Sequence, residues 1–261
     1  MDLTFIDPGF EYMIHGIMAF QTEATTSFWS APLFQFYPRL DQKYADSLRF
    51  SDRKDYIKSV LSAVYDEEKH VIDEKVVLYS RRWQECRPQI TAALSEAFHC
   101  DCGRLFPDLE CRVSLNPIEP RFLKEHAFDI FYLNSDQGAI GEAIHEIIHF
   151  VWFHIWNQIF GDSYDEYEAP SLKWIFSEMI VESVMKDPRL SSVNPYFPRE
   201  NGGCIYPYFF DMRVNGALIL DVLDELYRSL NIADFMKRGY ALCLDHEAEI
   251  RAHMKRAEEH T

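Results

Sequence analysis

The segment from Ile140 to Phe160 constrains the fold more than any other part of the chain, because apolar residues occupy nearly every side of it when it is drawn as a helix. One apolar stripe at helical spacing consists of Ile144, Ile148, Val151 and Ile155. Further apolar residues widen this stripe nearly all round the helix: Ile140, Ile147, Trp152 and Trp156. A helix that is apolar all round is buried at the centre of a domain. Asn134, Ser135 and Asp136 stand just before it as candidate N-caps, so we expect a long central helix that runs to about Phe160.

Two short strands are predicted before this helix. Cys111 to Leu115 alternates in polarity, and Phe128 to Leu133 forms a second short apolar run. Farther upstream, Ser51 to about His99 has a mostly helical pattern, with Pro88 in the first turn of its last helix. Residues 1–40 are rich in aromatic residues and irregular.

The chain after the central helix is predicted to be helical as well. A helix is expected over Leu172 to Met185, and two more at about Asp211–Leu230 and Ile232–Glu258, after a long loop at 191–208. The predicted fold class is therefore α+β and mainly helical, with a small mixed sheet preceding the central helix. We divide the chain into a mostly helical region, residues 1–100, packed on a core domain, residues 101–261.

Composition and charge exclude several classes of protein. The 261 residues are 48% hydrophobic and 15% aromatic, which is enough to bury a sizeable core. The formal net charge of −16 repels phosphate backbones and anionic lipid, so neither nucleic acid nor membrane is an expected partner. The acidic residues Asp2, Asp7 and Glu11 make the N-terminus unlike a secretory signal, and without such a signal six cysteines are expected to be reduced thiols in a cytoplasm. The oligomeric state is not predicted.

The central helix carries the string His145-Glu146-Ile-Ile-His149. Residues four apart lie on one face of a helix, so both imidazoles can reach a common metal ion. Glu146 lies one step round the helix, where its carboxylate can reach a water that the metal activates rather than the metal itself. Two imidazoles and a carboxylate would be costly to bury unpaired in an apolar helix. The string therefore predicts a zinc ion held by His145 and His149, with Glu146 as a general base.

A catalytic zinc takes three protein ligands and keeps one position open. His154 lies one step off the register that an extended histidine string would need, and Ile155 stands where its third histidine would be. The next predicted helix offers Glu178 and Glu182, both within an apolar stretch where a carboxylate needs a partner. The residues leave both open as the third ligand, and the other one is expected to orient a histidine through its second ring nitrogen or to lie on a solvated helix face.

The HEIIH string followed by Trp174-Ile-Phe-Ser-Glu178 resembles the gluzincin group of zincin metallopeptidases, over about Cys111 to Lys186. The resemblance implies a zincin-like fold in which two histidines and a downstream glutamate, here His145, His149 and Glu178, bind zinc. It also implies that Glu146 is the base. Met179 stands where the family often has glycine. In zincins the strand before the active-site helix forms the edge of the cleft and pairs with extended substrate, which assigns that role to Phe128, Ile130 and Tyr132.

A hydrolase also needs a donor for the developing oxyanion. Tyr206 and Tyr208 follow the glycine-rich loop Asn201–Gly203 and are our candidates, although clusters of aromatic residues more often serve packing. The expected activity is zinc-dependent hydrolysis, with activated water attacking an amide carbonyl of a peptide or protein substrate. The alternative is a zincin-like regulatory or binding protein that keeps the metal without peptidase turnover.

Overall fold

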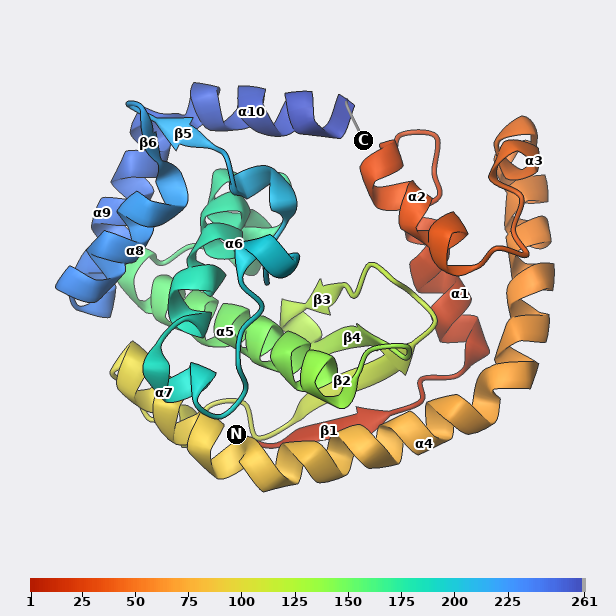
Figure 1. The fold of residues 1–261 in the computed structure, drawn as a ribbon, viewed down its shortest axis with the longest axis horizontal. Coiled ribbons are helices and arrows are strands. Elements are labelled where there is room, and N and C mark those ends of the chain that lie inside the picture. The colour runs from red at the N-terminus through yellow and green to blue at the C-terminus, as the bar shows by residue number, and fades with distance from the viewer. Residues whose placement is uncertain (260–261) are drawn as a thin grey trace.

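The computed structural model describes residues 1–259 and is mainly helical around one small sheet (Figure 1). The sheet holds four strands: β1 (Leu3–Ile6), β2 (Leu109–Ser114), β3 (Arg121–Phe122) and β4 (Ala127–Phe131). Their order is β1-β2-β4-β3, with β1, β2 and β4 parallel and β3 antiparallel to β4. The prediction of an α+β, mainly helical fold with a small mixed sheet is confirmed.

The N-terminal residues contribute more regular structure than their composition indicated. β1 pairs with β2, so the sheet combines chain from both sides of the boundary suggested near residue 100. Three helices follow β1: α1 (Phe10–Ala19), α2 (Ser27–Phe36) and α3 (Gln42–Ser47). Leu3 and Phe5 point to the buried side of β1, and their short alternation was hidden among the aromatic residues of the segment.

The predicted edge strand lies inside the sheet. β4 has β2 on one side and β3 on the other, so the prediction that Phe128–Leu133 forms the edge of the cleft is wrong. Phe128, Ile130 and Tyr132 are buried instead. The chain turns back after β2 and lays the segment 117–122 along β4, where the backbone N–H of Asp129 donates to the carbonyl of Pro120 at 2.9 Å. That segment, with β3, forms the edge of the sheet on the side of β4, and β1 forms the opposite edge.

A single helix, α4 (Phe50–Phe98), replaces the separate helices predicted between Ser51 and His99. It includes Pro88, although proline removes one helical hydrogen bond. Tyr79, Trp83, Ile90 and Leu94 lie on both sides of that proline and are fully buried, so packing holds the helix together across it. α4 contacts α5, β1 and β2 and runs along the outer border of the molecule in Figure 1.

The central helix, α5 (Asp136–Phe160), forms as predicted. The Ser135 hydroxyl caps it by accepting from the N–H of Gly138 at 3.0 Å, and Gly161 ends it with a positive φ of 72°. Ala139 to Phe153 is almost entirely buried, because α4, α6, α9 and β4 pack around it. The helix is therefore buried, as the apolar residues on nearly every side of it predicted.

The remaining helices cover the other side of α5. Ser171 caps α6 (Leu172–Met185), whose bounds match the prediction, and α7 (Pro188–Ser191) follows. The two long C-terminal helices that we predicted are three: α8 (Ile219–Ser229), α9 (Ile232–Asp245) and α10 (Glu247–Glu259). A hairpin of β5 (Arg213–Val214) and β6 (Ala217–Leu218) replaces the first helical turns that we predicted after Asp211. Gly216 lies in its tight turn with a positive φ of 80°, a conformation that glycine adopts readily. Among the helices described, none is long and apolar enough to cross a membrane.

Candidate metal centre

His145 and His149 project from the same face of α5. Their ring centroids are 4.9 Å apart, and the two Nε2 atoms lie 3.1 Å from each other. Both side chains are buried, His149 completely. The one-turn spacing that the sequence predicted therefore brings two imidazole nitrogens to one point.

Glu178 on α6 completes the group. The loop 161–171 reverses the chain, so that α6 packs on α5 and brings this carboxylate to both rings. Glu178 Oε2 lies 3.5 Å from His145 Nε2, and Oε1 lies 3.4 Å from His149 Nε2. One donor atom from each of the three residues falls within 4.8 Å of the others, which is the condition for sharing one ion.

The groups around the two histidines shift their pKa values in opposite directions. Burial lowers the pKa of His145, but Glu178, Glu142 and Glu146 outweigh burial and raise it to about 10. Burial and the guanidinium of Arg121 lower the pKa of His149 to about 4. Burial raises the pKa of Glu178, and His149, His145 and Arg121 reverse this and hold it well below its usual range. In the metal-free protein, protonated His145 therefore supplies a positive charge next to the Glu178 carboxylate.

The second nitrogen of His145 fixes how this ring is presented. Its Nδ1 lies 2.9 Å from the carbonyl oxygen of Cys204, which accepts a hydrogen bond from the ring and leaves Nε2 to face the shared point. Histidines that bind metals are commonly oriented in this way. His149 Nδ1 has no hydrogen-bond partner among the described residues, and its ring stacks on Phe153 instead, at an interplanar angle of 17°.

These residues fit a zinc ion. Two imidazole nitrogens and one carboxylate are a known donor set for catalytic zinc, and such a site leaves the fourth position open. All three donors are buried, so a divalent cation would offset the desolvation of Glu178. The oriented ring of His145 supplies the further support that a ligand needs.

Arg121 is a side chain of this site that the sequence did not predict. It comes from β3, an edge strand of the sheet, and its Nη1 donates to Glu146 Oε2 at 3.0 Å. Its Nη2 lies 3.5 Å from Glu178 Oε1. The guanidinium is nearly enclosed, with 10% of its side chain exposed. The only signal in the sequence was its place in the short segment between two predicted strands, which does not indicate a long-range ion pair.

Glu146 lies beside the two histidines and faces two ways. Arg121 engages its Oε2, while Oε1 lies 3.9 Å from His145 Nε2. One oxygen is thus held by Arg121, and the other lies on the side of His145. The sequence predicted the place of Glu146 beside the histidines but not its contact with Arg121, and its role as a base stays a prediction.

Glu182, the other candidate ligand, points elsewhere. It lies one turn beyond Glu178, and the two oxygens of its carboxylate are each 3.0 Å from Arg199 Nε. Lys186 also pairs with it. Glu182 therefore anchors the loop that carries Arg199 to α6 and is not one of the groups near the histidines.

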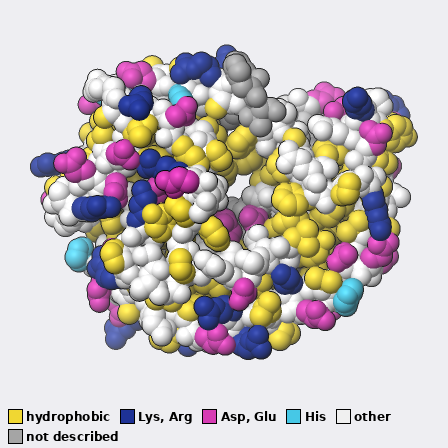
Figure 2. Space-filling view, in the orientation of Figure 1, with side chains coloured by type: hydrophobic (Ala, Val, Ile, Leu, Met, Phe, Trp, Pro, Cys, Tyr) yellow, Lys and Arg dark blue, Asp and Glu magenta, His cyan; other side chains and the backbone are white. Residues whose placement is uncertain are grey.

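A cleft of about 920 Å³ opens above the donors. Figure 2 shows this face hollowed near its centre, with acidic side chains at depth and hydrophobic side chains on the walls. Segments far apart in sequence line it: α2 with the turn before it, 117–121, one face of α5, the start of α6 and 203–207. Tyr206 lines the cleft, whereas Tyr208, Phe128, Ile130 and Tyr132 do not.

Tyr206 stands between the cleft and the N-terminal helices. Its ring lies 5.4 Å from Trp29 and 5.8 Å from Trp174, centroid to centroid, and stacks on Tyr208 at 5.3 Å. Burial, with Glu178 nearby, raises the pKa of its hydroxyl well above the ordinary value. The hydroxyl is therefore a neutral donor at any physiological pH.

Two further glutamates line the same cleft. Glu119 lies on the segment 117–121 and Glu142 on α5, one turn before Glu146. Burial raises the pKa of each, and the negative charge of Glu142 raises that of Glu119 further. For Glu142, the charge of His145 opposes the rise in pKa, whereas Glu146 and Glu178 add to it. The cleft is thus strongly acidic apart from Arg121 and His145.

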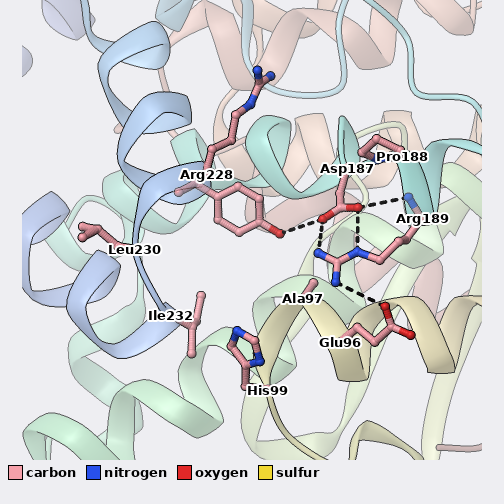
Figure 3. Close-up of a pocket in the computed structure, with 10 residues that line it drawn as sticks. Glu96, Ala97, His99, Asp187, Pro188, Arg189, Arg228, Leu230 and Ile232 are labelled. Atoms are coloured by element: carbon pink, nitrogen blue, oxygen red, sulfur yellow. Dashed lines mark hydrogen bonds and ion pairs between the residues drawn. The ribbon is translucent and has the colours of Figure 1, made fainter.

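A second hollow, of about 470 Å³, lies where the end of α4 meets α7 and α8 (Figure 3). Its charged groups pair with one another: Arg189 binds Asp187 and lies 3.4 Å from Glu96, and the Tyr227 hydroxyl donates to Asp187 at 3.4 Å. Arg228 pairs with Asp224 at 2.7 Å. These contacts join three helices, and among the residues that the structure describes no group of metal-binding side chains converges there.

Comparison with known proteins gives no further guide. No family model matches the chain, and neither the curated proteins nor the solved structures gave a significant match.

Proposed function

We propose that the protein is a zinc-dependent metallohydrolase with a zincin-like core of the gluzincin type, acting on peptides. The observation that supports this most is the convergence of His145 Nε2, His149 Nε2 and the Glu178 carboxylate within 4.8 Å, at the bottom of a cleft. Zinc in such a site supplies Lewis-acid chemistry, because it polarises a carbonyl group and acidifies water.

The chain's own residues have distinct tasks in this proposal. Glu146 accepts a proton at Oε1, the oxygen that lies 3.9 Å from His145 Nε2, while Arg121 holds Oε2 and so fixes the direction of the carboxylate. Tyr206 offers a neutral hydroxyl from the cleft wall to a developing oxyanion. Tyr208 does not line the cleft, so we assign it to packing.

The shape of the cleft suits an extended chain. It is open to the surface, and the edge segment 117–121 and aromatic residues of α2 lie among its walls. A peptide or protein is therefore the proposed substrate. The six cysteines are free thiols, which agrees with the proposal of a reducing compartment such as the cytoplasm.

The test begins with metal content. Protein purified without added metal is expected to contain about one zinc per chain, measured by mass spectrometry of the elements. His145→Ala and Glu178→Gln should lose most of it, whereas His154→Ala, on the same helix but outside the group, should keep it. Glu146→Gln should keep zinc and lose hydrolysis of peptides. Protein that neither carries nor takes up zinc would refute the proposal.

A second candidate function is a zincin-like binding protein that holds the metal without turnover. Two observations favour it: Arg121 engages the base Glu146, and Trp29 of α2 contacts Tyr206 beside the cleft. A peptide library screened with zinc-loaded protein separates the two functions. Broad inactivity together with a tightly bound protein partner would favour the binding protein.

A further inference from the structure

Two of the six cysteines lie in contact just beyond the end of α4. The sulfur atoms of Cys100 and Cys102 are 3.4 Å apart, and one of the two thiols donates a hydrogen bond to the other. In the part of the chain that the structure describes, no other two cysteines make such a contact. A disulfide bond is about 2.05 Å long, so a short approach of these two sulfurs would bond them.

A tight turn brings the two thiols together. The backbone N–H of Cys102 donates to the carbonyl of Cys100 at 2.9 Å, and Asp101 between them has φ −77° and ψ 79°. These are the features of an inverse γ-turn, which shortens the span between the two Cα atoms. In a bridged pair that span must stay below about 7 Å.

Ser95 of α4 holds both ends of this turn. Its carbonyl accepts a hydrogen bond from the N–H of Cys100 at 3.2 Å, and its hydroxyl accepts one from the N–H of Cys102 at 3.1 Å. The backbone therefore fixes the two cysteines next to each other before any bond forms between them.

The two thiols differ in exposure and in acidity. Cys102 is fully buried, whereas Cys100 is partly exposed. The hydrogen bond from Cys102 lowers the pKa of the Cys100 thiol, and the same bond together with burial raises the pKa of Cys102. The thiolate is the form of cysteine that attacks an oxidant. Cys100 is therefore the attacking thiol, and Cys102 keeps its proton beside it.

The surroundings of the pair favour a small uncharged oxidant. Arg104, the nearest cationic side chain along the sequence, pairs with Asp101 at 3.1 Å and so does not attract an anion. The net charge of −16 repels anionic oxidants such as glutathione disulfide. Hydrogen peroxide carries no charge and is small enough to reach a sulfur that is only partly exposed.

A metal ion is the competing partner of two thiols. Structural zinc takes four protein ligands. Among the described residues, the groups of three or more side chains that could share an ion all belong to the cleft, and none includes Cys100 or Cys102. Two sulfurs without a third donor fit a disulfide better than a metal site.

We propose that Cys100 and Cys102 form a redox-active dithiol that reacts with hydroperoxides and closes a reversible disulfide. A thiolate with access to solvent and a second thiol beside it is the arrangement that redox-sensing cysteines use. The dithiol lies outside the cleft, so this proposal does not depend on the proposed function.

The reaction takes two steps. The thiolate of Cys100 attacks one oxygen of hydrogen peroxide and becomes a sulfenic acid, while the O–O bond breaks and the hydroxide that leaves takes up a proton to form water. The sulfur of Cys102 then attacks that of Cys100, the S–S bond forms, and the S–O bond breaks to release a second water with the proton of Cys102. The two sulfurs lose two electrons to one peroxide. A thiol reductant such as glutathione or dithiothreitol returns them.

Mass mapping after exposure to hydrogen peroxide tests the proposal. The folded protein is treated, denatured, alkylated and digested with chymotrypsin, which cuts after Phe98 and Leu105 and so isolates both cysteines on one peptide. We expect two of the six thiols to escape alkylation. The peptide 99–105 should be lighter than its reduced form by two hydrogen atoms, and dithiothreitol should restore both thiols.

Three serine variants assign the roles. Cys100→Ser should slow oxidation of Cys102 at least about 10-fold, because a buried protonated thiol is a poor nucleophile. Cys102→Ser should leave a sulfenic acid on Cys100, which dimedone traps, and no bridge. Cys204→Ser is the matched control, since it removes the other partly exposed thiol and should leave the bridge unchanged.

Melting temperatures show that each variant is folded. If a serine variant does not fold, the peptide map of the unaltered protein decides, because it locates the bridge directly. Four results would each overturn the inference: a pair that stays reduced, a sulfinic acid on Cys100 in place of a bridge, a glutathione adduct that forms faster than the peroxide product, or a second zinc per chain that Cys100→Ser removes.

Discussion

The two longest helices place their polar residues in opposite environments. α4 spans Phe50–Phe98 with one face in water, and even an apolar residue on it, Val77, is 68% exposed. α5 spans Asp136–Phe160 and is buried on nearly every side, including at His145, Glu146 and His149. A polar side chain on α4 keeps its water, whereas one on α5 needs a partner inside the protein. The difference shows why three polar residues on α5 converge with Glu178 and Arg121, and why the many on α4 form separate surface pairs.

The comparison of α4 with α5 predicts the largest difference for the histidines, whose substitution should affect zinc content and hydrolysis on α5 but not on α4. His149→Ala should lower zinc content to near zero and reduce peptide hydrolysis more than about 10³-fold, because the metal loses one of three ligands. His70→Ala, at an exposed position of α4, should change neither. Elemental analysis and kcat/KM of both variants provide the measurement. Full zinc content in His149→Ala would show that the buried histidine has only a packing role.

Zinc affinity should depend steeply on pH, because zinc needs a neutral imidazole and the pKa of His145 is raised to about 10. Each pH unit below that value should weaken binding about tenfold, so affinity should rise roughly 10³-fold from pH 6 to pH 9. His149, with its pKa lowered to about 4, is already neutral in that range and adds no proton. Titration calorimetry in buffers of different ionisation enthalpy should detect release of about one proton. Binding without proton release would contradict this charge state.

Arginines on the two regions should differ in the free energy of unfolding. Arg121→Met removes the guanidinium that pairs with buried Glu146 and Glu178, which should cost about 3–5 kcal/mol in metal-free protein. Arg82→Met on α4 breaks the exposed pair with Glu85 and should cost less than about 1 kcal/mol. Urea unfolding measures both. Similar costs would mean that the enclosed ion pairs add no stability beyond a surface pair.

The smallest effect concerns the two tyrosines. Tyr206→Phe removes a hydroxyl from the cleft wall and should lower kcat about 10- to 100-fold, with zinc content and KM nearly unchanged. Tyr208→Phe should leave kcat unchanged, since that side chain does not line the cleft. Steady-state kinetics on one peptide substrate decides. A loss in Tyr208→Phe alone would reverse the assignment.

Local patterns predicted the parts of the fold that local forces decide. The apolar residues all round the segment and the N-cap at Ser135 predicted α5. The helical spacing of apolar residues after Ser171 predicted α6. β1 was missed because four residues carry too little alternation to stand out. The break expected before Pro88 was wrong, because packing on both sides offsets one lost hydrogen bond.

What the sequence alone determined is the pairing of His145 with His149 and the place of Glu146 beside them. These positions follow from helix geometry over five residues, which any buried helix would keep. Tertiary structure decided which of Glu178 and Glu182 lies near the histidines. The two are one helical turn apart, about 5.4 Å, so Glu178 lies next to His149 whereas Glu182 lies next to Arg199. Tertiary structure also decided the role of Arg121 and the identity of the sheet edge. Both depend on how segments distant in sequence pack together, and no spacing along the chain records that.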